Sequence, residues 1–189
     1  MTMRRTFLAL PLLLAACGSA DLYLTPPVEA PGGRMGSVGG GLAVADMSLP
    51  TYAEAVEVAQ LGPSGAVTLD KNALWADTPR RALTRHLIAA LQARLSGQIS
   101  SEPWPAFDPP ALRVEVFVDR MIGGPEGPFT FAGQYVLVSP QSGRIVSTDR
   151  FAITVQAGAG PQGVVDANAR AVEALADQIA ARVTGRPIG

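Results

Sequence analysis

The sequence predicts an α/β or α+β fold, in which a single domain packs a mixed β-sheet with an antiparallel meander against two long amphipathic helices. Its length of 189 residues suits one domain. Three successive segments, 112–118, 129–138 and 145–155, have strand character and are joined by short Gly-, Pro- and Ser-rich turns. Two further segments, 74–95 and 165–183, repeat apolar residues at helical spacing.

Composition and charge exclude several classes of protein. With 48% hydrophobic and 16% charged residues, the chain is not disordered by composition. The formal net charge of −1 supplies no field for nucleic acid, so we expect no nucleic-acid partner. The chain has one cysteine and one histidine, which excludes an internal disulfide framework and argues against a Cys/His zinc site. We expect neither a metal nor a cofactor.

Residues 1–16 have the character of a lipoprotein signal peptide. Arg4 and Arg5 precede an apolar run over residues 7–14, which is far shorter than the ~20 residues of a membrane-spanning helix. The following Leu14-Ala15-Ala16-Cys17 resembles the bacterial lipobox. That resemblance implies cleavage before Cys17, a diacylglycerol on its sulfur and an acyl chain such as palmitate on its new amine. The alternative is an ordinary signal with an incidental cysteine.

Gly18 follows the expected lipid-attachment site. In enterobacterial lipoproteins an Asp at this position marks retention in the inner membrane. The resemblance therefore implies an outer-membrane, periplasm-facing location, with inner-membrane retention as the alternative.

Residues 17–41 form the expected acylated N-terminus, a short strand and a linker. The segment 21–25 alternates apolar and polar residues, and nine of the sixteen residues in 26–41 are Gly or Pro. If Leu22–Leu24 docks on the sheet, the linker is a long surface loop. If it does not, the linker extends the tether from the membrane. The globular domain then covers residues 42–189.

The first half of this domain begins with three expected strands, at 42–49, 55–61 and 65–69. The period then changes, because leucines recur every four residues from Leu83 to Leu95. Asp77 or Thr78 can cap this helix, Pro79 fits its first turn, and Gly97 is expected to end it.

No catalytic motif accompanies these elements, and a non-enzymatic protein is predicted. His86 is interpreted as a helix-flank residue rather than as a base or ligand. Glu115 and Asp119 share one strand face but lie about 13 Å apart, too far for a carboxylate dyad. A solvated helix face is favoured over a phospholipid-headgroup site for the basic side chains of Arg80, Arg81 and Arg85. For Trp75, a core position is favoured over a partner contact.

Short motifs in a characteristic order resemble one family. After the lipobox come Tyr23-Leu-Thr-Pro26, Leu49-Pro50-Thr51-Tyr52 and Leu74-Trp75-Ala76-Asp77, followed by the meander and a C-terminal helix rich in Ala and Leu. This order is similar to that of the ABC-type transport auxiliary lipoproteins, which include the PqiC (YmbA) group of membrane-integrity-associated transporter subunits. The resemblance covers nearly the whole chain. It marks Tyr23, Pro50, Tyr52 and Trp75 as partner or structural motif residues.

The resemblance implies an auxiliary subunit without catalytic activity. Such a subunit works with an MCE-domain protein and inner-membrane transport components to move lipids between the two membranes and to maintain envelope integrity. A homo-oligomer capping an MCE tunnel is compatible with the rotational symmetry of such tunnels. Two alternatives remain open: a stand-alone lipoprotein that binds a lipid or cell-wall ligand, and an enzyme whose site has no recognisable motif.

Overall fold

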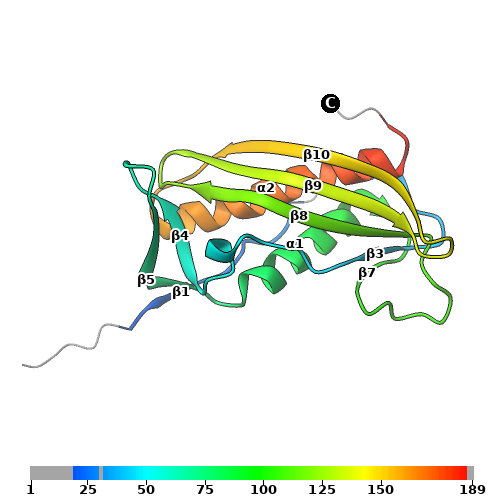
Figure 1. Cartoon of the computed structure of the whole chain (residues 1–189), viewed down its shortest axis with the longest axis horizontal. Helices are drawn as coiled ribbons and strands as arrows, with labels where there is room; N and C mark the ends of the chain where they lie inside the picture. Colours follow the sequence, from blue (N-terminus) through cyan, green and yellow to red (C-terminus); the bar gives the residue numbers. More distant parts are fainter. Residues whose placement is uncertain (1–18, 30–31, 187–189) are drawn as a thin grey trace, which may run out of the picture.

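The computed structural model describes residues 19–29 and 32–186, which form three β-sheets and two long helices (Figure 1). The largest sheet has the order β10-β9-β8-β3-β7, a second has the order β1-β5-β4, and β2 pairs with β6. The strands are β1 (Asp21–Tyr23), β2 (Gly36–Ser37), β3 (Leu42–Val44), β4 (Glu57–Leu61), β5 (Val67–Trp75), β6 (Leu95–Ser96), β7 (Ile99–Ser101), β8 (Leu112–Gly123), β9 (Pro128–Ser139) and β10 (Arg144–Gln156). The helices are α1 (Pro79–Arg94) and α2 (Gly160–Val183), with a short 3-10 turn at Thr51–Ala53.

The predicted α+β class and the antiparallel meander are confirmed. Strands β8, β9 and β10 pair antiparallel in sequence order, while β3 lies parallel to both β8 and β7, which makes the large sheet mixed. The strands are not all in one sheet, however. Strands β4 and β5 form a separate small sheet with β1 at one end of the molecule (Figure 1).

Both helices cover the same face of the large sheet, and the core lies between the helices and the sheet (Figure 1). Alternation along each meander strand sends every second side chain into this core, including Val114 and Val116 of β8 and the aromatic rings of β9. From the helices, the predicted leucine stripe of α1 and the Val, Leu and Ile stripe of α2 meet these side chains. The opposite face of the sheet carries charged side chains, among them Glu115 and Asp119, together with the exposed ring of Phe117.

The boundary between β5 and α1 differs from the prediction. The helical period was expected to begin at Leu74, but Leu74 and Trp75 end β5, where they pair with Leu22 and Tyr23 of β1. Helix α1 begins at Pro79, which confirms the predicted place of the proline in the first turn. Thr78 is the N-cap residue but makes no side-chain capping bond. Asp77 instead accepts a hydrogen bond from the N–H of Thr78 at 2.8 Å.

The other helix ends also depart from the sequence pattern. Helix α1 ends at Arg94, and the chain continues directly into β6, so Gly97 is not its cap. Helix α2 begins at Gly160, five residues before the predicted 165, because Pro161 is tolerated in a first turn that precedes the apolar stripe. The predicted strand at 42–49 is regular only over Leu42–Val44.

Of the two alternatives for the N-terminal segment, the docked one is observed. β1 pairs parallel with β5, and Gly36–Ser37 pairs with β6. The described parts of residues 21–41 therefore run along the folded domain as strands and surface loop.

Candidate functional site

The motif residues Tyr23 and Trp75 lie side by side at the edge of the small sheet. They are register partners of β1 and β5, and the N–H of Ala76 donates to the carbonyl of Tyr23 at 2.9 Å. Trp75 is 8% exposed and belongs to the core, as the favoured interpretation predicted, whereas Tyr23 is half-buried against it. The predicted lipid-attachment residue Cys17 lies outside the described residues.

Pro50 and Tyr52 have a structural role in joining the first half of the chain to the meander. The carbonyl of Pro50 accepts the N–H of Ala53 at 2.8 Å, which closes the short 3-10 turn. The hydroxyl of Tyr52 accepts the backbone N–H of Met121 at 3.0 Å. This bond lies just after the register shift between Val118 and Arg120 in the β8–β9 pairing. At such an irregularity the regular backbone hydrogen bonds are interrupted, and the Tyr52 hydroxyl serves as the acceptor for β8.

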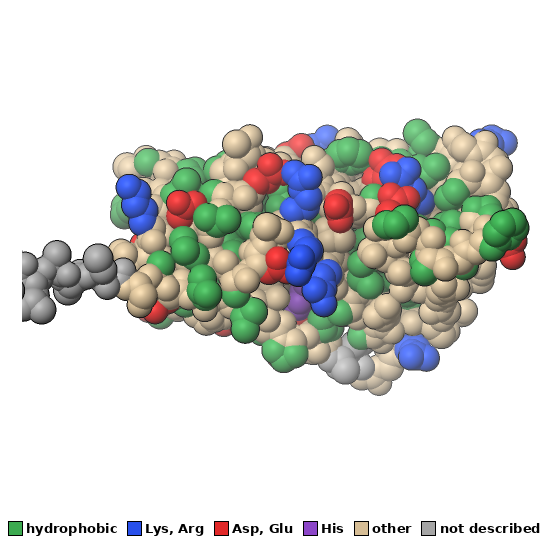
Figure 2. Space-filling view, turned by 90° about the horizontal axis from the view of Figure 1, so that it is seen from below, with side chains coloured by type: hydrophobic (Ala, Val, Ile, Leu, Met, Phe, Trp, Pro, Cys, Tyr) green, Lys and Arg blue, Asp and Glu red, His purple; other side chains and the backbone are tan. Residues whose placement is uncertain are grey.

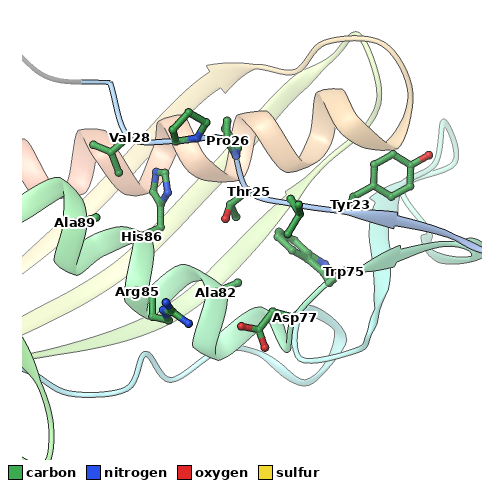
Figure 3. A pocket seen from close by; sticks show the side chains of 12 residues that line it. Tyr23, Thr25, Pro26, Val28, Trp75, Asp77, Ala82, Arg85, His86 and Ala89 are labelled. Carbon is green, nitrogen blue, oxygen red and sulfur yellow. The ribbon is translucent and has the colours of Figure 1, made fainter.

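A groove of about 350 Å³ lies between α1 and the segment that follows β1 (Figure 3). Residues 24–28 form one wall, and Ala82, Arg85, His86 and Ala89 of α1 form the other. Its lining is mainly apolar, while the charged groups of Asp77 and Arg85 belong to its α1 side. The groove can therefore receive an elongated, mainly apolar group with a polar end.

His86 contributes to this groove from a buried position. Its ring is 4% exposed, and its Nε2 lies 3.1 Å from Oε1 of Glu173 in α2. Burial lowers the pKa of His86, and the hydrogen bond to Glu173 opposes that shift. The predicted position on the flank of the helix is therefore wrong. His86 lies in the interface between the two helices, where it links α1 to α2.

A second polar link between the helices was missed by the sequence reasoning. Arg94, which is buried, donates through Nε and Nη2 to the two carboxylate oxygens of Asp177 at 2.6 and 3.2 Å, and through Nη1 to the carbonyl of Ala90. Such a two-pronged pair fixes distance and orientation together. With His86–Glu173, it sets the register in which α1 and α2 pack.

The basic face predicted for α1 is present at the start of the helix. Arg80 pairs with Glu54, and Arg81 pairs with Asp77 at 2.9 Å, both at exposed positions. These pairs agree with the favoured interpretation of a solvated face.

Glu115 and Asp119 are not brought together. Both lie on the open face of the large sheet, where Glu115 pairs with Arg113 at 3.1 Å and Asp119 pairs with Arg150 at 3.4 Å. Within residues 19–29 and 32–186, no cluster of three or more His, Cys, Asp or Glu side chains could hold a metal ion. In the same part of the chain, neither helix has the length and apolar character needed to cross a membrane.

The end of the molecule opposite the small sheet carries a hollow of about 760 Å³ and several exposed apolar side chains. The loop 103–110 and the turn at Gln141 both border this hollow, together with Gly41. Trp104 closes the loop by donating its indole N–H to the carbonyl of Asp108 at 3.0 Å. Phe107, in the middle of the loop, is fully exposed.

A second chain segment at this end also carries exposed hydrophobic side chains. Ile145 and Val146, at the start of β10, are 66% and 57% exposed and follow the turn that borders the hollow. Neither these residues nor Phe107 belongs to a motif that predicts a site. The run Pro103–Pro110 could have indicated a presented loop, but a lone phenylalanine in such a run gives no orientation.

Two solved structures share the overall fold. One is the crystal structure of an uncharacterized protein, which is 18% identical with a TM-score of 0.70 and covers 87% of this chain and 99% of its own. The other, a protein of Xanthomonas campestris assigned to the family model DUF330, is 15% identical with a TM-score of 0.69 and covers 85% of this chain and 93% of its own. No curated protein matches the sequence significantly.

The match to a family model is more specific than these similarities of fold. The model described as the ABC-type transport auxiliary lipoprotein component matches residues 23–180. This span begins at Tyr23 in β1 and ends within α2, so it includes nearly every described element. The motif order noted in the sequence and this match agree: the chain belongs to the family of ABC-type transport auxiliary lipoprotein components.

Proposed function

We propose that the protein is a non-enzymatic, outer-membrane lipoprotein subunit of an MCE-type, ABC-linked system that moves lipids between the two membranes and supports envelope integrity. The observation that carries this proposal is the family match over residues 23–180. In the proposal, acylated Cys17 anchors the domain in the membrane, and an MCE-domain protein linked to inner-membrane transport components is its partner.

The position of β1 determines which end of the domain lies close to the anchor. β1 begins four residues after Cys17, and an extended chain of four residues spans at most ~14 Å. The end formed by β1, β4 and β5 is therefore held near the membrane. The end formed by loop 103–110 and the turn after β9 points away from it (Figure 1).

That far end is the candidate contact for the partner. Protein interfaces depend on a few large apolar or aromatic anchors, and exposed hydrophobic patches mark such surfaces. Phe107 has this character because Trp104 packs against Gly41 and holds the loop in place. A Cβ on Gly41 would lie 2.7 Å from the Trp104 ring. Ile145 and Val146 are further exposed apolar side chains at this end of the domain.

Complementation of a deletion strain tests the proposal, with detergent sensitivity as the measurement. Phe107→Ser and Ile145→Ser change exposed side chains, so both variants should fold and reach the membrane but fail to restore detergent resistance. Cys17→Ser should remain unprocessed, take up no palmitate and also fail. Glu115→Gln, at a half-buried ion pair, and Asp119→Asn, at an exposed one, lie on the open sheet face and should complement fully.

Other outcomes of the same assay contradict the proposal. Full complementation by Phe107→Ser combined with Ile145→Ser would remove the far end as the partner surface. Loss of function in Asp119→Asn, with normal folding and acylation, would favour an enzyme instead. Cleavage of the wild-type signal in the presence of globomycin, an inhibitor of lipoprotein signal peptidase, would refute the lipid anchor.

The groove beside α1 favours a second candidate, a stand-alone lipoprotein that binds a lipid or cell-wall ligand. Its mainly apolar lining and the charges of Asp77 and Arg85 would fit an amphiphile. Purification of the acylated protein from envelope membranes separates the two functions. Recovery of an MCE-domain protein supports the transport subunit, whereas recovery of a lipid or glycan without any transport component supports the stand-alone module.

A further inference from the structure

The small sheet β1-β5-β4 packs part of one face into the core, and no other helix or strand within residues 19–29 and 32–186 covers its other face. Tyr23, Trp75 and Val58 point inward. On the other side, the register places Leu22 beside Leu74 and Leu74 beside Glu57. Beyond the register shift between β4 and β5, it places Ala59 beside Leu69 and Leu61 beside Val67. We call these seven residues the outer face.

The outer face is apolar over three strands. Glu57 is its one charged member, and the other six are alanine, valine or leucine. The exposed Lys71 lies in the irregular part of β5 between Leu69 and Leu74. Leu22 is 66% exposed, and Val67 and Leu69 are each 44% exposed. Single exposed apolar residues are ordinary, but apolar side chains gathered on one side of three paired strands form the kind of surface that other molecules cover. Figure 2 shows hydrophobic side chains at this end of the molecule, with a few charged side chains among them.

We propose that the outer face lies against the lipid bilayer that holds Cys17, with Leu22, Val67 and Leu69 at the boundary between headgroups and acyl chains. This inference rests on the acylated Cys17 of the proposed function. The face is not the partner surface proposed above, which lies at the opposite end of the domain.

The length of the chain before β1 selects the bilayer as the occupant. Leu22 is five residues from Cys17, which limits its distance from the anchored residue to at most ~18 Å. The headgroup region of one leaflet is itself about 5–8 Å thick. An apolar surface held this close to an interface reaches the acyl boundary by a modest tilt of the domain, without any other protein. Interfacial binding of this kind grows with the buried apolar area.

The β4–β5 hairpin contains its own control position. Thr68 is exposed like its neighbour Leu69, but it lies on the other side of the hairpin, and its hydroxyl donates to the carbonyl of Gln60 at 3.3 Å. A bilayer seated on the outer face contacts residue 69 and leaves residue 68 in water. Ser142, in the turn between β9 and β10, marks the far end of the domain.

The test uses the acylated mature protein in vesicles of phosphatidylethanolamine and phosphatidylglycerol. Because Cys17 is the one cysteine of the chain and its sulfur is consumed by the diacylglycerol, a new cysteine can be labelled selectively. Leu69→Cys, Thr68→Cys and Ser142→Cys each carry an environment-sensitive fluorophore. Doxyl lipids in the vesicles quench fluorophores that reach the acyl boundary. Val67→Cys is the second outer-face variant if Leu69→Cys does not fold, as judged by circular dichroism.

We expect the fluorophore at residue 69 to shift its emission to the blue and to be quenched severalfold more than the one at residue 68, with residue 142 unquenched. Equal quenching at 69 and 68 overturns the proposal. A blue shift at residue 69 that depends on a higher protein concentration and not on vesicles also overturns the proposal, because a second copy of the chain would then cover the outer face. A blue shift that appears only when another envelope protein is added overturns it as well.

The mass of the mature N-terminus separates this inference from the proposed function. An unmodified Cys17 refutes the lipid anchor, and the proposed function and this surface fall together. An acylated Cys17 with equal quenching at residues 68 and 69 refutes the membrane-facing sheet alone. The role at the far end of the domain is then unaffected.

Discussion

Replacement of Leu87 by alanine tests whether α1 packs on the sheet as described. The Leu87 side chain is completely buried in the core. Removal of its three outer carbons forfeits about 2.4 kcal/mol of transfer free energy, at ~0.8 kcal/mol per buried carbon. The cavity that remains adds to this loss, and fully buried leucines replaced by alanine typically cost ~2–5 kcal/mol. We therefore expect Leu87→Ala to lower the free energy of unfolding by about 3–4 kcal/mol.

The same substitution at Leu69 is the matched control. Leu69 is 44% exposed and borders solvent, so its replacement forfeits just over half of the transfer term and leaves no closed cavity. We expect a loss of about 1 kcal/mol. Urea unfolding followed by circular dichroism measures both variants, and the slope with denaturant should stay unchanged. Equal midpoints for the two variants would mean that the packing face of α1 is misplaced.

Three further predictions concern single residues of the described part. Because burial lowers the pKa of His86, the unfolded chain binds a proton at this residue more readily than the folded chain does. The free energy of unfolding should therefore fall as the pH drops below about 6.5, and it should fall less in His86→Gln. Identical pH dependence in both proteins would contradict this. The hydroxyl of Tyr135 is buried without a hydrogen-bond partner among the described residues, and burial raises its pKa to about 12. Tyr135→Phe should therefore leave the free energy of unfolding unchanged or raise it by up to about 1 kcal/mol. A clear loss of stability in urea unfolding would reveal a missed partner. Gly41 lies beneath the Trp104 ring with a φ of +87°. Gly41→Ala should therefore lower the free energy of unfolding by about 1–3 kcal/mol and speed proteolysis within loop 103–110. A cleavage rate equal to that of the wild type would show that Trp104 does not hold the loop.

The meander and the helix cores could be predicted because their periods are long and regular. Over 112–118, every second residue is apolar, and Leu83, Leu87 and Leu91 recur every four residues in α1, so each pattern fits one element only. The small sheet could not be predicted in the same way. Leu74 and Trp75 fit either the end of a strand or the start of a helix, and pairing with β1, some fifty residues earlier, decides between them.

The site features that were missed depend on contacts between distant segments. Sequence period places His86 beside the leucine stripe, but its partner Glu173 is 87 residues away and has no signature of its own. Arg94 has the same character, because an arginine in the last turn of a helix is ordinary until Asp177 is placed opposite it. Phe107 stands out only when its complete exposure is known. Motif order could identify the family, but not the surfaces through which this member acts.

Photo-crosslinking in intact envelopes tests the proposed transport role most directly. A photoreactive phenylalanine analogue replaces Phe107 at the far end of the domain, and the same analogue at Phe117, an exposed aromatic on the open sheet face, is the control. We expect an adduct with an MCE-domain protein from position 107 and little or none from position 117. Adducts of equal yield at both positions, or no MCE-domain protein in the adduct from position 107, would contradict the proposed transport role.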